Sequence, residues 1–192
     1  MLKKTFISAF LFLSVLSVYF GSYLPFEKAQ LYITALKQLT GVRSVGEFKE
    51  NFGRVFDFYS PVGQEEVAKY IGNDVLNTVY GVESSSAEIV AREVTSFAEP
   101  HMLKNDVRHL TLMGQWYYVM WGRFKNSNDL KRAEEYQLAA FEIGPKLPPV
   151  LYGLMDTYRA VGNKQKIQEL GKYILSLWPD DAGTKKVLRD FS

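Results

Sequence analysis

The sequence predicts an all-α protein in which a single N-terminal transmembrane helix is followed by an α-helical solenoid with two repeat units and a C-terminal capping helix. Three observations predict this fold. An uncharged run of 22 residues lies near the N-terminus, and a pattern of 34 residues occurs twice near the C-terminus. Elsewhere apolar residues recur at helical spacing, and no stretch shows the alternation typical of a β-strand.

The composition permits one membrane segment and one packed domain, and it excludes several kinds of chemistry. Of the 192 residues, 47% are hydrophobic and 15% are aromatic, which is ample for a core. Lysine and arginine total 23 against 21 acidic residues, so the charge balance gives no reason to expect nucleic-acid binding. The chain has no cysteine, which excludes disulfides, thiolate metal sites and cysteine nucleophiles.

Residues 1–26 are predicted to be a transmembrane signal anchor. Lys3 and Lys4 precede the uncharged run Thr5–Phe26, which as a helix is about 33 Å long and matches a bilayer core of about 30 Å. Because lysines favour the cytoplasmic side, we expect a single-pass protein of the inner (plasma) membrane, with a cytoplasmic N-terminus and an extracytoplasmic C-terminal domain. The alternative is a secreted soluble protein whose signal peptide is cleaved near Ser17.

Residues 27–43 are predicted to form a juxtamembrane helix, and residues 44–104 a helical region of degenerate repeats. The juxtamembrane helix continues or kinks from the span at Pro25 and stops at Gly41. In the helical region, proline at Ser60-Pro61 is typical of a first helical turn. The expected helices are Ser44–Phe58, Ser60–Gly81 and Ser85–Glu99.

Two capping boxes and a set of apolar positions support these helices. The boxes are Ser44-Val45-Gly46-Glu47 and Ser85-Ser86-Ala87-Glu88, in which a serine hydroxyl accepts an amide hydrogen bond at the helix start. We expect one apolar face on each helix. Its positions are Phe48, Phe52, Val55 and Phe56 in the first helix, Val67, Ile71, Val75 and Val79 in the second, and Ile89, Val90, Val94 and Phe97 in the third.

Residues 105–192 contain the repeat. Gly114–Leu147 aligns with Pro148–Asp181, and each unit consists of an apolar helix, a polar turn, a second apolar helix and a closing proline. The paired positions are Phe124 and Tyr158, Asn128 and Gly162, Asp129 and Asn163, Ala133 and Ile167, Ala140 and Ile174, and Pro145 and Pro179. Asp129 and Asn163 are predicted N-caps of the second helices. Asp181–Phe191 is the predicted capping helix, packing through Val187 and Leu188.

The aromatic run Gln115–Trp121 is interpreted mainly as core rather than as a ligand-stacking box. In the 34-residue register the inward positions are Tyr117, Met120, Trp121 and Phe124 in the first unit and Leu151, Leu154, Met155 and Tyr158 in the second. His101 and His109 lack the converging partners of a zinc site, and Asp180-Asp181 is interpreted as a helix cap. Phosphate-binding, dinucleotide-binding and nucleophile-elbow motifs are absent. We therefore expect no enzyme activity, catalytic residue, metal or cofactor.

The repeat resembles the tetratricopeptide (TPR) family, over Gly114–Asp181 and the capping helix. The match includes small residues at Ala133 and Ala140. Ile167 and Ile174 stand where the family has alanine, and Gln137 and Gly171 stand where it has an aromatic residue, and these departures suggest slightly wider helix packing. The resemblance implies a protein or peptide partner bound in a groove lined by the first helix of each unit. The groove residues that it implies are Gln115, Tyr118, Lys125, Tyr152, Asp156 and Arg159.

A second resemblance covers Thr5 to Asp181 and concerns the order of parts. The membrane helix, the segment Ser60–Glu66, the run Asn105–Arg108 and the repeat pair together resemble the extracytoplasmic repeat tail of bacterial O-antigen ligase and polymerase family proteins. The resemblance implies a membrane-anchored scaffold for protein–protein interaction in cell-envelope polysaccharide assembly. An alternative is a detached tail or accessory subunit of such a ligase or polymerase system.

Overall fold

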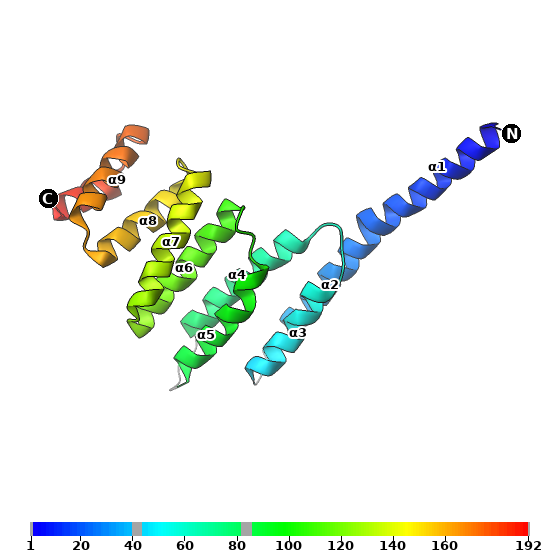
Figure 1. Ribbon diagram of the computed structural model, residues 1–192, viewed down its shortest axis with the longest axis horizontal. Helices are drawn as coiled ribbons and strands as arrows, with labels where there is room; N and C mark the ends of the chain where they lie inside the picture. Colours follow the sequence, from blue (N-terminus) through cyan, green and yellow to red (C-terminus); the bar gives the residue numbers. More distant parts are fainter. Residues whose placement is uncertain (1, 40–43, 82–85, 192) are drawn as a thin grey trace. The chain divides into compact units, whose positions relative to one another are not determined.

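The computed structural model describes residues 2–39, 44–81 and 86–191. Helix accounts for 85% of the chain and the described residues include no strand, so the prediction of an all-α protein is confirmed. The chain divides into two compact units, residues 1–71 and 72–192. In chain order the helices are α1 (Leu2–Val18), η1 (Tyr19–Tyr23), α2 (Leu24–Leu39), α3 (Val45–Asp57), α4 (Gln64–Gly81), α5 (Ala87–Ala98), η2 (Glu99–His101), α6 (Val107–Phe124), α7 (Ser127–Ile143), α8 (Pro148–Val161), α9 (Lys164–Leu177) and α10 (Ala182–Asp190) (Figure 1).

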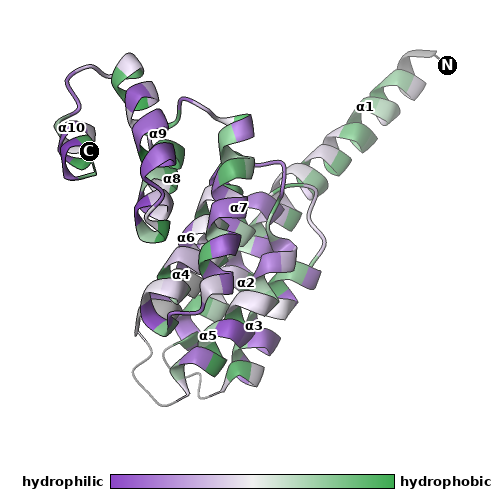
Figure 2. Cartoon of the chain, turned by 60° about the vertical axis from the view of Figure 1, so that its left-hand side comes forward, coloured by the Kyte–Doolittle hydropathy of each residue, from purple (hydrophilic) through white to green (hydrophobic). Residues whose placement is uncertain are grey.

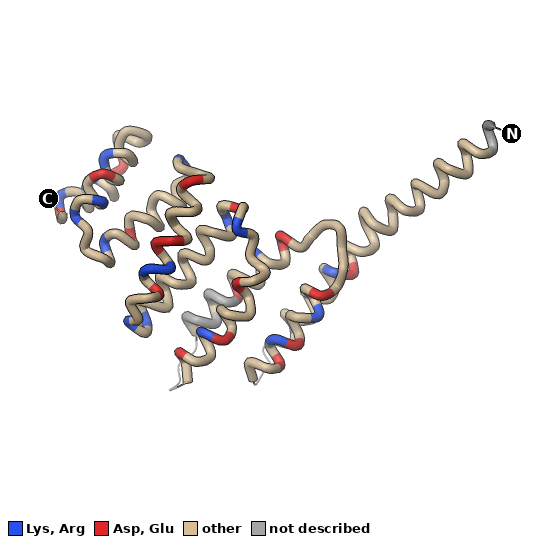
Figure 3. The backbone as a smooth tube through the Cα atoms, viewed as in Figure 1, with Lys and Arg blue, Asp and Glu red and all other residues tan. Residues whose placement is uncertain are grey.

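The N-terminal helix is continuous from α1 through η1 into α2. Its segment Thr5–Leu39 is long and apolar enough to cross a membrane, and only 6% of its most apolar window is buried within the protein. The uncharged stretch is visible in Figure 3, where the described part of α1 is tan, and in Figure 2, where it carries mostly green and pale residues. These properties agree with the predicted span as far as length and composition can show it.

The turn before Pro25 is a π-helical turn, in which the Leu24 N–H bonds the carbonyl of Tyr19 five residues back. Proline has no N–H, and its ring clashes with the carbonyl four residues earlier in an ordinary helix. A turn with i→i+5 bonding displaces that carbonyl, which explains how the helix passes Pro25 without ending. Of the two expected outcomes at Pro25, continuation is therefore the one observed.

The core of the first unit lies along α3. All four predicted core residues of this helix, Phe48, Phe52, Val55 and Phe56, are buried. The Ser44 hydroxyl accepts the N–H of Glu47 at 3.1 Å, as the capping box predicts. Lys28 of α2 is also buried, and its ammonium group donates to the carbonyl of Phe58 at 2.7 Å and to the side-chain oxygen of Gln64. This lysine thus fastens the loop between α3 and α4 to α2.

The start of α4 differs from the prediction. The helix begins at Gln64 and not at Pro61, because Gly63 has a φ of 89°, which an α-helix does not contain. The Ser60 hydroxyl donates to the carbonyl of Val62 and so holds a turn at this point. The predicted stop at Gly41 and the predicted cap at Ser85 lie outside the described residues, as do the side chains of Val75 and Val79.

In the second unit each of the helices α6 to α10 packs against the next one along the chain (Figure 1). Trp116 of α6 is fully buried, and its indole N–H donates to the carbonyl of Gly72 at 2.9 Å. A cluster of apolar side chains from α8 and α9 continues the core, and Val187, Leu188 and Phe191 pack against it. The capping helix therefore covers the apolar face of α8 and α9, and Asp181 caps its first turn at the N–H of Thr184.

The turns within the two repeat units do not follow the 34-residue register. The N-cap of α7 is Asn126 and that of α9 is Asn163, 37 residues later, so the prediction of Asp129 as an N-cap is wrong. Asp129 is instead buried inside α7. The helix before each cap ends in a left-handed residue, Lys125 with φ 58° and Gly162 with φ 73°, and these residues set where each turn occurs.

The packing positions follow the register more closely than the turns do. Ala133 and Ala140 of α7 and their counterparts Ile167 and Ile174 of α9 have no exposed surface. The predicted core residues of the aligned segment 148–181 are all buried, namely Leu151, Leu154, Met155 and Tyr158. Tyr117 and Met120 of the segment 114–147 are buried as well. Trp121 and Phe124 are only half-buried, because α6 ends at Phe124. The pattern missed Trp116, whose burial depends on Gly72.

Candidate functional site

A groove of about 500 Å³ lies between α6 and α8, over α7, and we call it the α6–α8 groove. Its lining residues are Gln115, Tyr118, Val119, Gln137, Pro149, Tyr152, Gly153 and Asp156. Four of the six residues that the sequence analysis assigned to a binding groove are in this set: Gln115, Tyr118, Tyr152 and Asp156. The structure thus brings together residues of two helices that the chain separates by about one repeat.

The other two predicted residues do not line the α6–α8 groove. Lys125 ends α6 in a left-handed conformation, and its ammonium nitrogen lies 4.8 Å from the centre of the Trp121 ring. Arg159 lies one turn after Asp156 on α8 and pairs with its carboxylate at 3.0 Å. Both cations are therefore engaged outside the groove, and none of the described residues that line it is basic.

Gln137 forms the polar floor of the groove, and sequence reasoning did not select it as a site residue. Its side chain is 2% exposed, its amide nitrogen donates to the carbonyl of Thr111 at 3.5 Å, and its carbonyl oxygen has no hydrogen-bond partner among the described residues. A Cβ at Gly114 or at Gly153 would lie 2.6 Å from the Gln137 amide nitrogen. Two glycines on facing helices therefore leave the space in which this amide fits.

The two tyrosines of the groove have different environments. Tyr118 is half-buried, and its ring lies 5.7 Å from that of Trp121. Tyr152 is 38% exposed, its ring stacks at 6.4 Å on Trp178, and its hydroxyl donates to the carboxylate of Asp181. This hydrogen bond, followed by that from the Thr184 N–H, holds the pKa of Asp181 below its ordinary value. Tyr152 thus joins the groove to the cap of α10.

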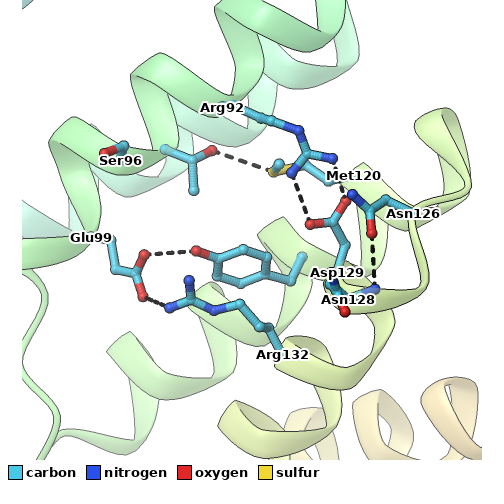
Figure 4. A pocket seen from close by; sticks show the side chains of 10 residues that line it. Arg92, Ser96, Glu99, Met120, Asn126, Asn128, Asp129 and Arg132 are labelled. Carbon is cyan, nitrogen blue, oxygen red and sulfur yellow. Dashed lines mark hydrogen bonds and ion pairs between the residues drawn. The ribbon is translucent and has the colours of Figure 1, made fainter.

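A second cavity, of about 330 Å³, lies between α5 and the α6–α7 pair (Figure 4). On one side the guanidinium of Arg92 bonds both carboxylate oxygens of Asp129 at 3.0 Å, and it also pairs with Glu88 at 2.7 Å. The bond to Asp129 is the main reason why the pKa of Arg92 is raised. Asp129 is 3% exposed, so this charge is buried and depends on its partner.

On the other side of this cavity Glu99 is the centre of a polar cluster. Its carboxylate accepts hydrogen bonds from the hydroxyls of Tyr117 and Tyr136. It also pairs with Arg132 (Figure 4). Burial, and then the bond to Glu99, raises the pKa of Tyr117 above its ordinary value. Because the charges at both sides of the cavity are paired across helices, we interpret it as a junction that holds α5 to α6 and α7.

Of the predicted capping pair only Asp181 caps a helix, since Asp180 is exposed and lies 3.6 Å from Lys185, and both histidines contact other residues of the fold. His109 is fully buried, and its Nδ1 accepts the N–H of Leu103 at 2.8 Å. The ring of His101 lies 5.6 Å from that of Phe97. Asp181 is the N-cap of α10, as predicted. Within the part of the chain that the structure describes, no group of three or more acidic or histidine side chains could hold a metal ion.

Comparison with protein-family models, with curated proteins and with solved structures finds no match for this chain. The likeness to tetratricopeptide repeats and to ligase tails therefore stays a prediction from the sequence.

Proposed function

We propose that the protein is a membrane-anchored scaffold of the tetratricopeptide type that binds a protein or peptide partner in the α6–α8 groove. One observation carries the proposal. Four of the six residues that the repeat resemblance implied for a binding groove line a single cavity in the structure. A cavity of about 500 Å³ with two tyrosines and a few polar groups has the size and composition of a site for a peptide segment.

The packing of the second unit supports a repeat array. Successive helices are neighbours in space, and positions 34 residues apart in α7 and α9 are equally buried. In such arrays each helix pair contacts mainly the pairs beside it, and a terminal helix covers the last apolar face. The position of α10 against α8 and α9 agrees with this arrangement.

The pulldown that tests the groove uses the full chain solubilised from membranes. We expect Tyr118→Ala combined with Tyr152→Ala to abolish recovery of the partner, because the change removes the two aromatic surfaces of the groove. Circular dichroism should stay unchanged, and the melting temperature should fall only by the effect of losing the Tyr152 contacts with Asp181 and Trp178. Tyr59, which is 68% exposed and outside the second unit, supplies the matched control Tyr59→Ala. Tyr152→Phe separates loss of the ring from loss of the hydrogen bond to Asp181.

Partner recovery that survives in the double variant, or that is lost only together with the fold, would remove the α6–α8 groove as the binding site. Identification of the recovered partner tests the cell-envelope part of the proposal. A polytopic membrane glycosyltransferase in the eluate would support a role as an accessory subunit in O-antigen-type polysaccharide assembly. A set of unrelated partners would contradict that role while leaving the scaffold function in place.

The membrane anchor predicts a definite topology. Because Lys3 and Lys4 precede the uncharged run, we expect the anchor to span the inner membrane and the C-terminal domain to lie outside the cytoplasm. Protease added to intact spheroplasts should digest this domain, and the N-terminal mass should show an uncleaved chain. Full protection until lysis would contradict the orientation, and a mass that begins near Ser17 would favour the secreted form.

A further inference from the structure

We propose that the α6–α8 groove takes a basic side chain of an extended partner peptide, with Gln137 and Asp156 as its hydrogen-bond acceptors. This inference rests on the binding function proposed above and adds the chemical class of the bound group. Lys125 and Arg159, which the repeat resemblance assigned to the groove, do not line it and take no part in this inference.

The first observation is the orientation of the Gln137 amide. The Thr111 carbonyl can only accept a hydrogen bond, so the group that faces it at 3.5 Å is the amide nitrogen. The carbonyl oxygen is thereby left as a buried acceptor without a partner among the described residues. Buried acceptors are nearly always paired, so this one identifies a place where a hydrogen-bond donor is missing.

The second observation is the space around that amide. Gly114 of α6 and Gly153 of α8 both lie against Gln137, and a side chain at either position would collide with it. Gly153 and Gln137 also line the groove. The torsion that turns the amide, χ3, has a broad energy profile, so a small rotation presents the oxygen to a group that enters the groove. The glycines thus keep the acceptor close to the cavity.

The third observation is the charge and chemistry of the remaining lining. Asp156 contributes a carboxylate that is half-exposed, and its pair with Arg159 is a surface ion pair of the kind that contributes little. Tyr118 and Tyr152 offer aromatic faces, which attract cations. Of the described lining residues none is basic, so a ligand carboxylate would find no cation in the groove, whereas an ammonium or guanidinium group finds acceptors and rings.

The test uses peptides displayed on phage and selected against the full chain in lipid nanodiscs, with empty nanodiscs as background. We expect arginine or lysine to be enriched at one fixed position. The enriched peptide is then synthesised twice, once with the basic residue and once with norleucine in its place. Fluorescence anisotropy compares the two peptides on the unmodified chain and on Asp156→Asn, Gln137→Leu and the control Asp190→Asn.

On the unmodified chain we expect the basic peptide to bind at least about tenfold more tightly than the norleucine peptide, the usual size of a hydrogen bond to a charged group. Asp156→Asn and Gln137→Leu should each narrow this ratio severalfold, whereas Asp190→Asn should leave it unchanged. Circular dichroism spectra of the four proteins show whether the fold is intact.

Two further outcomes separate this inference from the function on which it rests. Enrichment of acidic or apolar peptides would overturn the basic-side-chain inference, and so would an affinity ratio of the two peptides that neither variant changes. The groove would remain the binding site in either case if Tyr118→Ala still abolishes binding. Phage enrichment no stronger than on empty nanodiscs would overturn the binding function of the groove and this inference with it. Peptide affinity that is unchanged by Tyr118→Ala would have the same consequence.

Discussion

Gln137 in α7 and Gly171 in α9 lie 34 residues apart, at matching positions of the two aligned sequence segments, and the space beside each is filled in opposite ways. At Gly171 the missing side chain is replaced from outside, because a Cβ there would lie 2.5 Å from Cδ2 of Leu188 in α10. At Gln137 the side chain is present, and it is Gly114 and Gly153 on the neighbouring helices that lack one.

The difference teaches how one position of a repeating pattern can serve two purposes. In α9, Gly171 lets α10 approach and cover the apolar core. In α7, Gln137 lies between Gly114 and Gly153 and places a polar amide on the floor of the α6–α8 groove. At both positions the space is filled, by Leu188 of α10 at Gly171 and by the side chain of Gln137 itself beside Gly114 and Gly153.

The largest effect on stability is expected at Gly171, where α10 packs against α9. Gly171→Leu should lower the free energy of unfolding by about 1–3 kcal/mol, because the new side chain takes the space of Leu188. Leu188→Ala in the same chain should recover part of the loss. Chemical denaturation of both variants measures the effect, and equal stability of Gly171→Leu and the unmodified chain would contradict the close approach of α10.

A smaller effect on stability is expected at Gly153 in the groove, and its sign should depend on whether Gln137 is present. Gly153→Ala should destabilise the chain by about 1 kcal/mol, because its Cβ meets the Gln137 amide. In a Gln137→Ala background the same change should stabilise the chain by about 0.5–1 kcal/mol, because alanine is the better helix former. A double-mutant cycle measures both values, and additivity of the two changes would show that the residues do not touch.

Gln137→Leu should leave the fold intact and raise the free energy of unfolding by about 1 kcal/mol, because it removes a buried acceptor that has no partner. The melting temperature measures this gain, and Gln165→Leu on the exposed surface of α9 is the matched control. A clear loss of stability would indicate that the Gln137 amide is a structural bridge rather than a groove acceptor.

The smallest effect concerns pH. The pKa of Asp181 is held below its ordinary value of 3.8 by hydrogen bonds from Tyr152 and Thr184. Its contribution to stability is therefore fully present above pH 3.8 and is lost as the pH falls through the lower pKa of the folded state. Thermal melts below pH 4 should decline less steeply for Asp181→Asn than for the unmodified chain. Parallel curves would indicate that the cap of α10 does not titrate in this range.

The sequence predicted the helices and most of the core, because apolar spacing and caps are local signals. Ser44, Asn163 and Asp181 cap helices as their spacing predicts. Together with the repeat resemblance, the register implied six groove residues, four of which line the groove. It failed at Asp129, because the left-handed residue Lys125 moves the first turn by about one helical turn and no pattern marks a lysine for that conformation.

The residues that sequence reasoning missed depend on contacts between distant segments. Trp116 is buried through its bond to the carbonyl of Gly72, and Asp129 is buried through its pair with Arg92. Neither partner belongs to the repeat, so no periodicity connects them. The departure of Gln137 from the family pattern was visible in the sequence. Its place on the groove floor depends on Gly114 and Gly153 on other helices, which no local pattern predicts.

The π-helical turn at Tyr19–Tyr23 has a consequence for chimeras that exchange the membrane anchor. Bonding five residues back accommodates one residue more than an ordinary turn, and each residue advances a helix by about 100°. A helical wheel drawn straight through residues 2–39 therefore assigns the wrong face to everything before the turn. Replacing the anchor with a regular helix that ends at Leu24 would rotate the foreign segment by about 100° relative to α2. Exchange at Val18 keeps the phase.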